Sequence, residues 1–185
     1  MKNSEKPQPI HTPFTNHFDI KYPIICAPMF LVSSVEMVVK ASNAGGLGTF
    51  PAFNYRPIEN YRKAIREIKQ QTKQPFGVNI IVQKTNKFQK DQLEIALDEK
   101  VPLIISSLGN PKEVIRLAHE VGTKVYCDIV NIEHAKKVIG LGADGLIAMG
   151  SGAGGHAGDI SIFALIPSLK KICQVEIPDT TIPII

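Results

Sequence analysis

Short apolar runs alternate along the chain with stretches in which apolar residues recur every three or four positions. Six of the runs are nearly continuous in Val, Ile and other apolar residues; they span 23–29, 47–52, 75–82, 102–108, 124–130 and 144–149. Continuous hydrophobicity is typical of parallel strands that are buried on both faces of a sheet. We therefore predict six parallel β-strands.

The stretches between these runs have the period of amphipathic helices. Four apolar helix faces are marked by Ile58, Tyr61, Ile65 and Ile68; by Val114, Leu117, Ala118 and Val121; by Ile132, Ala135, Val138 and Ile139; and by Ile162, Leu165, Ile166 and Leu169. Ser34 is a candidate N-cap for a helix that Gly45 and Gly46 would end. A weaker helical pattern surrounds 93–97. Strand and helix are thus expected to alternate.

Strict alternation of strand and helix leaves an open doubly wound sheet or a (β/α)₈ barrel as the main architectures. Six full units are present, and Thr181–Ile185 has the pattern of a seventh strand that has just begun. A complete barrel needs about 250 residues. We therefore expect an α/β fold that is an incomplete (β/α)₈ TIM barrel, in a truncated chain or a shortened gene product.

Two regions follow from this division of the chain. Residues 1–18 are polar and contain several prolines, which indicates an N-terminal arm or a cover over the bottom of the barrel. Residues 19–185 form a single partial barrel domain without an internal linker. Its unpaired edge strands would favour association with other chains, so a homo-oligomer is expected as one outcome.

Composition excludes several classes of protein. The 185 residues include 21 Lys and Arg against 17 Asp and Glu, a net charge of +4 that is spread along the chain, which argues against nucleic-acid binding. No run reaches the roughly 18 apolar residues of a membrane span, and the first residues lack a secretory core, so we expect a cytoplasmic protein. The three cysteines show no metal-binding spacing, and no metal site is predicted.

The segment 150–158 carries the strongest chemical signal, because five of its nine residues are glycine and it directly follows the sixth strand. Such a loop allows a ligand to approach the backbone closely and presents N–H groups to an anion or a ring carbonyl. It contains His156, and an imidazole can exchange a proton near neutral pH. A flexible loop with an incidental surface histidine is the alternative interpretation.

Other strand ends carry polar or unusual residues. Pro28 and Met29 end the first strand, either as an ordinary strand end or as an apolar contact for a flat ring. Asn79 lies inside an apolar strand, where its amide needs a ligand or a neighbouring backbone as its partner. Asp128 lies inside the fifth strand and either faces the cavity or pairs with a cation.

A weak dinucleotide-binding pattern overlaps the same loop. Gly150, Gly152 and Gly155 have the spacing of that fingerprint. They follow the sixth strand instead of the first, however, and the helix begins several residues later. A nicotinamide dinucleotide site is therefore a minor alternative.

Taken in order, several motifs resemble the nitronate monooxygenase family, also called 2-nitropropane dioxygenases. The matching segments are 23-PIICAPM-29, 43-NAGGLGTF-50, 75-PFGVNI-80, 105-ISSLGNP-111 and 151-SGAGGHAG-158. The last segment contains the family's Gly-x-Gly-Gly-His-x-Gly signature, from Gly152 to Gly158. The resemblance implies an FMN-dependent barrel related to the FMN-using enoyl-ACP reductases.

The resemblance also implies roles for individual residues. Ala27, Pro28 and Met29 would pass along the flavin ring, Asn79 would hydrogen-bond FMN, and His156 would be the catalytic base or acid. Further expected cofactor contacts come from Asp128, Gly154, Gly155 and Ser168, the last standing where the family often has a Gln. The implied reaction converts an alkyl nitronate or nitroalkane, with O₂, to a carbonyl compound and nitrite.

Two alternatives remain beside this function. One is the enoyl-ACP reductase branch of the same flavin barrels, which would need NAD(P)H and acyl carrier protein. The other is an inactive remnant that binds no flavin. The family's phosphate site comes from loops after strands seven and eight, which lie beyond Ile185, and its loss would weaken FMN binding.

Overall fold

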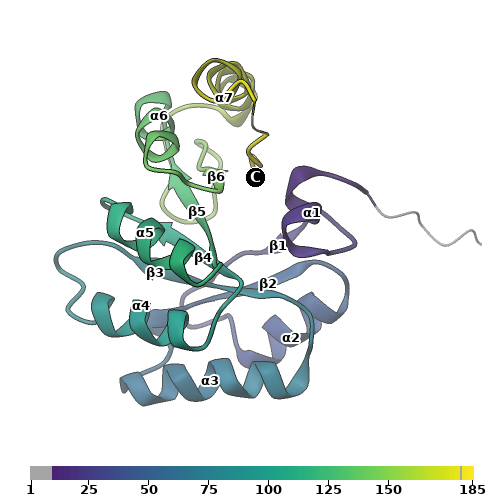
Figure 1. Ribbon diagram of the computed structural model, residues 1–185, viewed down its shortest axis with the longest axis vertical. Coiled ribbons are helices and arrows are strands. Elements are labelled where there is room, and N and C mark those ends of the chain that lie inside the picture. The colour runs from purple at the N-terminus through teal and green to yellow at the C-terminus, as the bar shows by residue number, and fades with distance from the viewer. Residues whose placement is uncertain (1–9, 180) are drawn as a thin grey trace, which may run out of the picture.

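A computed structural model describes residues 10–179 and 181–185 of the chain. Its centre is one sheet of parallel strands in the order β1-β2-β3-β4-β5-β6. The strands are β1 (Ile25–Cys26), β2 (Leu47–Pro51), β3 (Phe76–Ile81), β4 (Leu103–Ser107), β5 (Lys124–Ile129) and β6 (Gly145–Ala148). Each strand pairs with the next along the chain, and the sheet curls as in an incomplete TIM barrel (Figure 1). The predicted fold class is confirmed.

Helices connect the strands and lie along the outside of the curled sheet (Figure 1). They are α2 (Val35–Asn43), α3 (Ile58–Gln71), α4 (Gln89–Asp98), α5 (Lys112–Glu120), α6 (Ile132–Gly140) and α7 (Ile162–Glu176), with a short 3₁₀ turn, η1 (Ala52–Asn54), after β2. The Ser34 hydroxyl accepts a hydrogen bond from the Met37 N–H at 3.2 Å, as expected of an N-cap. The weak helical pattern around 93–97 belongs to α4.

The segment 183–185 continues the sheet beyond β6. Ile184 bridges Leu146 in parallel orientation. The Ile185 N–H donates to the Leu146 carbonyl at 2.9 Å, and the Ala148 N–H donates to the Ile185 carbonyl at 2.8 Å. These bonds have the pattern of a parallel ladder, so the predicted start of a seventh strand is confirmed.

The sheet separates two apolar cores, because successive side chains of a strand point to opposite faces. The larger core lies between the sheet and the outer helices and includes Phe50, Val78, Ile104, Val125 and Leu146. The smaller core lies inside the curl and contains Leu47, Leu103, Ile105 and Tyr126. Burial on both faces explains why the strands appear in the sequence as continuous apolar runs.

The inner core is closed at its bottom by helix α1 (Pro13–Phe18). Phe14 and Phe18 pack on Tyr126 with ring centroids 6.0 and 5.8 Å apart, and His17 Nδ1 lies 2.9 Å from the Tyr126 hydroxyl. Gly145 makes room for that tyrosine, since a Cβ there would lie 2.5 Å from its ring. Residues 10–18 thus form a cover over the barrel bottom; the rest of the predicted arm, 1–9, lies outside the described residues.

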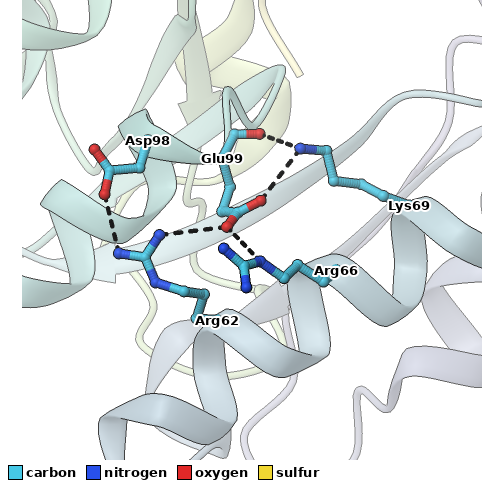
Figure 2. A network of polar contacts seen from close by, with 5 residues as sticks. All are labelled: Arg62, Arg66, Lys69, Asp98 and Glu99. Atoms are coloured by element: carbon cyan, nitrogen blue, oxygen red, sulfur yellow. Dashed lines mark hydrogen bonds and ion pairs between the residues drawn. The ribbon is translucent and has the colours of Figure 1, made fainter.

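Helices α3 and α4 are joined on the outer surface by a cluster of charges (Figure 2). The Glu99 carboxylate, 10% exposed, accepts hydrogen bonds from Arg66 at 2.8 Å and Arg62 at 3.3 Å, and Lys69 donates to the Glu99 carbonyl at 2.6 Å. Burial works to raise the pKa of Glu99, but the hydrogen bonds from Arg66 and Arg62 lower it overall. This cluster fixes the end of α4 against α3, close to the amino end of β4, which begins at Leu103.

No helix in the described part of the chain is long and apolar enough to cross a membrane.

The turn after β4 depends on Gly109, and a pair of alanine variants tests this. Gly109 has φ +121°, and a Cβ there would lie 1.9 Å from the Val82 carbonyl oxygen. We expect Gly109→Ala to lower the free energy of unfolding by about 3 kcal/mol. Two costs add: the backbone strain of alanine at this positive φ and the steric clash of its Cβ with the Val82 carbonyl. Gly122 has φ +79° but open space around it, so Gly122→Ala should cost about 1 kcal/mol. Urea unfolding followed by circular dichroism measures both; equal losses would contradict the close contact.

Candidate functional site

The carboxyl ends of all six strands lie at one edge of the sheet, because the strands are parallel. Three polar side chains from neighbouring strands meet near this edge: Asn79 on β3, Ser107 on β4 and Asp128 on β5. Asn79 Nδ2 donates to Ser107 Oγ at 2.6 Å, and the Ser107 hydroxyl donates to Asp128 Oδ2. The three residues form one directional chain of hydrogen bonds, which we call the polar chain.

Strand register explains why these residues meet. Asn79 pairs with Ile105, which in turn pairs with Tyr126. Ser107 and Asp128 each lie two positions further along their strands, so both side chains point to the same face, one step nearer the carboxyl end. Ser107 and Asp128 therefore lie one step above the apolar layer of Ile105 and Tyr126, and Asn79 lies level with it.

The orientation of the Asn79 amide follows from its partners. Its nitrogen donates to the Ile105 carbonyl at 3.2 Å as well as to Ser107. A carbonyl can only accept, so the nitrogen must face it, and both N–H bonds are used. Asn79 Oδ1 has no donor among the described residues. The strand thus offers a ligand one half-buried hydrogen-bond acceptor.

Asp128 is half-buried at the end of the polar chain. Burial raises the pKa of Asp128 to about 6, against the smaller effects of the Ser107 hydrogen bond and the charge of His156, which lower it. The loop that carries His156 follows β6 at the same edge of the sheet, and a Cβ on its Gly158 would lie 2.9 Å from the Val130 Cβ, just after β5. Asp128 lies at the carboxyl edge of the sheet, and among the described residues it forms no ion pair with a Lys or Arg.

The glycine-rich loop after β6 is fixed at its base and open at its tip. The Gly158 N–H donates to the Met149 carbonyl at 3.1 Å, and the Ser151 N–H donates to the Ile160 carbonyl at 2.9 Å. A Cβ on Gly158 would lie 2.6 Å from the Met149 oxygen, which requires glycine. A Cβ on Gly154 or on its neighbour Gly155 would meet no atom within 4 Å. His156 is exposed on this open tip.

The loop after β1 is held in place by one amide. Asn54, in the 3₁₀ turn after β2, accepts from the Leu31 N–H at 2.9 Å and donates to the Met29 carbonyl at 3.1 Å. The Met29 N–H in turn donates to Ser33 Oγ at 2.9 Å. Ala27 and Met29 remain exposed at the carboxyl end of β1, and Pro28 is half-buried between them. The segment predicted to lie along a ring is thus ordered by contacts from β2.

Ser168 is separate from this arrangement. It lies on α7, and its hydroxyl donates to the Ala164 carbonyl of the same helix at 2.9 Å. Because that bond uses its proton, only acceptor capacity remains for another group. Its cofactor contact stays a prediction. The described residues also contain no cluster of three or more His, Cys, Asp and Glu that could hold a metal ion.

A hollow of about 750 Å³ in the surface does not coincide with the carboxyl edge. It lies on the outer face of α3 and includes Ile58, Arg62, Arg66 and Ile95. None of the predicted site residues lines it. Its charged walls belong to the α3–α4 cluster of Figure 2, so the hollow is a feature of helix packing.

Comparison with known proteins identifies the family. The sequence pattern described as nitronate monooxygenase matches residues 11–93 and 85–185, which together cover nearly the whole chain. The chain belongs to the nitronate monooxygenase family. The resemblance of the five motifs, predicted from the sequence, is therefore confirmed.

Relatives within and around this family carry different names. A "(3aS,4S,5R,7aS)-5-hydroxy-7a-methyl-1-oxo-octahydro-1H-indene-4-carboxyl-CoA dehydrogenase" from Mycobacterium tuberculosis is 31% identical over 91% of this chain and 47% of its own length. A nitronate monooxygenase from Pseudomonas aeruginosa is 29% identical over 78% of this chain and 52% of its own length. The structure of FabK from Thermotoga maritima has a TM-score of 0.84 and 33% identity, over 95% of this chain and 53% of that one. The chain thus spans about half the length of these nitronate monooxygenase-like relatives.

Two residues that organise the candidate site are not among the predicted site residues. Ser107 lies in the matching segment 105-ISSLGNP-111 but has no predicted role there, and no sequence motif includes Asn54. A period-2 count along 103–107 would place Ser107 on the same face as Leu103 and Ile105, which was the available signal. Asn54 had no such signal, because its partners are backbone groups 21 to 25 residues away.

The raised pKa of Asp128 predicts how stability depends on pH. Between about pH 4 and pH 6 the native state binds more protons than the unfolded state, so the free energy of unfolding falls as pH rises through this window. Asp128→Asn should remove this fall in the free energy of unfolding, because the amide does not bind a proton in this pH range. We expect its stability relative to the wild type to increase by about 2 kcal/mol from pH 4 to pH 7.

Urea unfolding of both proteins across this pH range is the measurement. The control is Asp159→Asn, which removes an exposed carboxylate from the neighbouring loop and leaves the polar chain intact. If the free energies of unfolding of the wild type and Asp128→Asn differ by the same amount at all pH values, Asp128 is not a buried titrating group.

Proposed function

We propose that this chain carries the catalytic edge of an FMN-dependent nitronate monooxygenase, which converts an alkyl nitronate or nitroalkane and O₂ to a carbonyl compound and nitrite. The observation that carries the proposal is the polar chain at the carboxyl edge of the sheet, beside the base of the glycine-rich loop that bears His156. Active sites of TIM barrels are built at this edge. The family match and the Pseudomonas aeruginosa relative favour nitronate chemistry.

The described residues fit a flavin in three respects. Asn79 Oδ1 is an unused acceptor, as a ring N–H requires. The open glycines at 154 and 155 would let a flat ring approach the backbone of the loop. Met29 and Ala27 offer an exposed apolar border on a loop that Asn54 holds rigid. When bound, FMN would supply the electron transfer that no side chain here can provide.

The protein's own part in this reaction is to bind and orient the substrate and to handle its proton. A nitronate is an anion, so a protonated His156 would attract it to the loop. For the neutral nitroalkane, the same imidazole would take the proton from the carbon next to the nitro group. The apolar layer that includes Ile105 and Tyr126 forms the floor of the site, below Ser107 and Asp128.

An enoyl-ACP reductase is the second candidate, and the fold similarity to FabK favours it. That reaction consumes NAD(P)H and reduces the double bond of an acyl thioester. Anaerobic oxidation of NADH that depends on a crotonyl thioester would support it. Nitrite release from a nitroalkane in the absence of NADH would support the monooxygenase.

Replacement of His156 tests the proposed function directly. In the 185-residue chain incubated with FMN, we expect His156→Gln to lower kcat/KM for nitrite release about 100-fold or more, because it removes the proton-transferring group. Flavin content, measured by the visible absorption of the bound ring, should remain that of the wild type. Nitrite formation and oxygen consumption are followed together.

The matched control is His134→Gln, an exposed histidine on α6 that lies outside the site. It should leave nitrite release unchanged. Full activity of His156→Gln would remove this residue from the catalytic role. If the wild-type chain binds no FMN, the proposed function is wrong for this chain, and the chain is an inactive remnant that binds no flavin.

A further inference from the structure

Exposed apolar side chains gather in the loops that follow the strands. In the part of the chain that the structure describes, most of the large apolar side chains that are exposed lie at the carboxyl edge of the sheet. They are residues 29–32 after β1, Phe88 at the end of the loop after β3, Leu108 after β4, and Ile162 and Phe163 where α7 begins. We call this set the apolar rim. Exposed apolar residues that are concentrated in one region, and not scattered singly, mark a binding surface.

Two leucines of the apolar rim have a backbone conformation that leucine rarely adopts. Leu31 has φ +62° and is 76% exposed, and Leu108 has φ +54° and is 38% exposed. This left-handed region favours glycine and asparagine, because a larger side chain brings its Cβ too close to a carbonyl oxygen. Neither leucine is buried in return. Backbone strain of this kind clusters at sites that bind ligands.

Hydrogen bonds at the strand ends hold both leucines beside the candidate site. The Leu31 N–H donates to Asn54 Oδ1 at 2.9 Å, and Asn54 Nδ2 donates to the Met29 carbonyl at 3.1 Å. Leu108 directly follows Ser107 of the polar chain, whose carbonyl accepts a hydrogen bond from the Val82 N–H at 2.7 Å. The backbone of each leucine is thus fixed, while its side chain remains exposed.

We propose that the apolar rim binds the hydrocarbon part of the substrate, so that the site prefers nitronates with a long apolar chain to short ones. This inference rests on the proposed function, because it names the substrate class of the same site. The rim is continuous with that site: Leu108 follows the polar chain, and Met29 borders the position expected for the ring. Ile162 lies at the base of the glycine-rich loop, where a Cβ on Gly150 would lie 3.0 Å from the Ile162 nitrogen.

Burial of the hydrocarbon chain gives the dependence on chain length that this proposal requires. Each methylene group that moves from water to an apolar surface increases affinity by about threefold. Nitroethane offers the rim a single methyl group, whereas 1-nitrooctane offers a chain that can cover several of its side chains. For nitronates held with the reacting carbon at the same place, kcat/KM should therefore increase with the length of the chain.

A double substitution separates binding by the two leucines from a role in folding. Asparagine adopts the left-handed region more readily than leucine and has no apolar side chain. We expect Leu31→Asn/Leu108→Asn to have a free energy of unfolding equal to or higher than that of the wild type. The ratio of kcat/KM for the nitronates of 1-nitrooctane and nitroethane should fall about tenfold. Urea unfolding and nitrite release measure the two quantities.

The matched control is Val175→Asn, at a 71% exposed position near the far end of α7. It should keep the wild-type ratio. A wild-type ratio in Leu31→Asn/Leu108→Asn would overturn the proposal, and so would a clear loss of stability, which would assign the leucines to folding. If sedimentation velocity shows a wild-type dimer that the double variant dissociates, a second copy of the chain covers the rim, and the proposal is again wrong.

Binding without turnover distinguishes a failure of this inference from a failure of the proposed function. In the chain without cofactor, we expect octanoate to shift the ¹H–¹⁵N NMR signals of Val32 and Gly109, which neighbour the two leucines. Butyrate, which has the same charge and a shorter chain, should not shift them at the same concentration. If no nitronate yields nitrite but octanoate shifts these signals, the proposed function is wrong and the rim still binds an apolar chain. The absence of an octanoate shift would overturn the inference.

Discussion

Burial of the parallel sheet on both faces is the constraint on which the other features depend. The outer face is covered by helices, and the lower half of the inner face is filled by Phe14, Phe18 and Tyr126. A polar side chain in such a sheet needs a partner near the strand ends or a backbone carbonyl, as Thr49 has in Cys26 at 2.6 Å, because most other neighbours are apolar. Asn79, Ser107 and the loops therefore collect at the carboxyl edge, where a site can form without an unpaired group in the core.

The cover over the barrel bottom and the site above it are parts of the same arrangement. Tyr126 occupies the space that Gly145 leaves free, and α1 packs against it from below. The next inward position on that strand is Asp128. A single strand thus carries the residue that closes the interior and, two positions later, the residue that faces the ligand side. A change in the packing of α1 on Tyr126 would therefore act on the position of Asp128, because β5 carries both residues.

Much of the fold could be predicted because binary patterning is a local property. The six apolar runs and the helical faces required only the periods of strand and helix, and the start of the seventh strand required only its composition. The arrangement of the site was harder to predict from the sequence. His156 and Asn79 were visible as unusual residues in their segments, but the bond from Asn79 to Ser107 depends on the register between β3 and β4. Register between strands is set by packing in three dimensions, which no single segment encodes.

Two aspartates on neighbouring strands show how the two ends of the barrel differ. Asp144 lies at the amino end of β6. Burial alone would raise the pKa of Asp144, but hydrogen bonds from Lys124, the Val125 N–H and His119 outweigh burial, so the pKa is lowered overall. Asp128 receives one hydrogen bond from a neutral hydroxyl, so burial prevails. A fully paired carboxylate stabilises the bottom of the barrel, while an incompletely paired one at the top retains affinity for a cation.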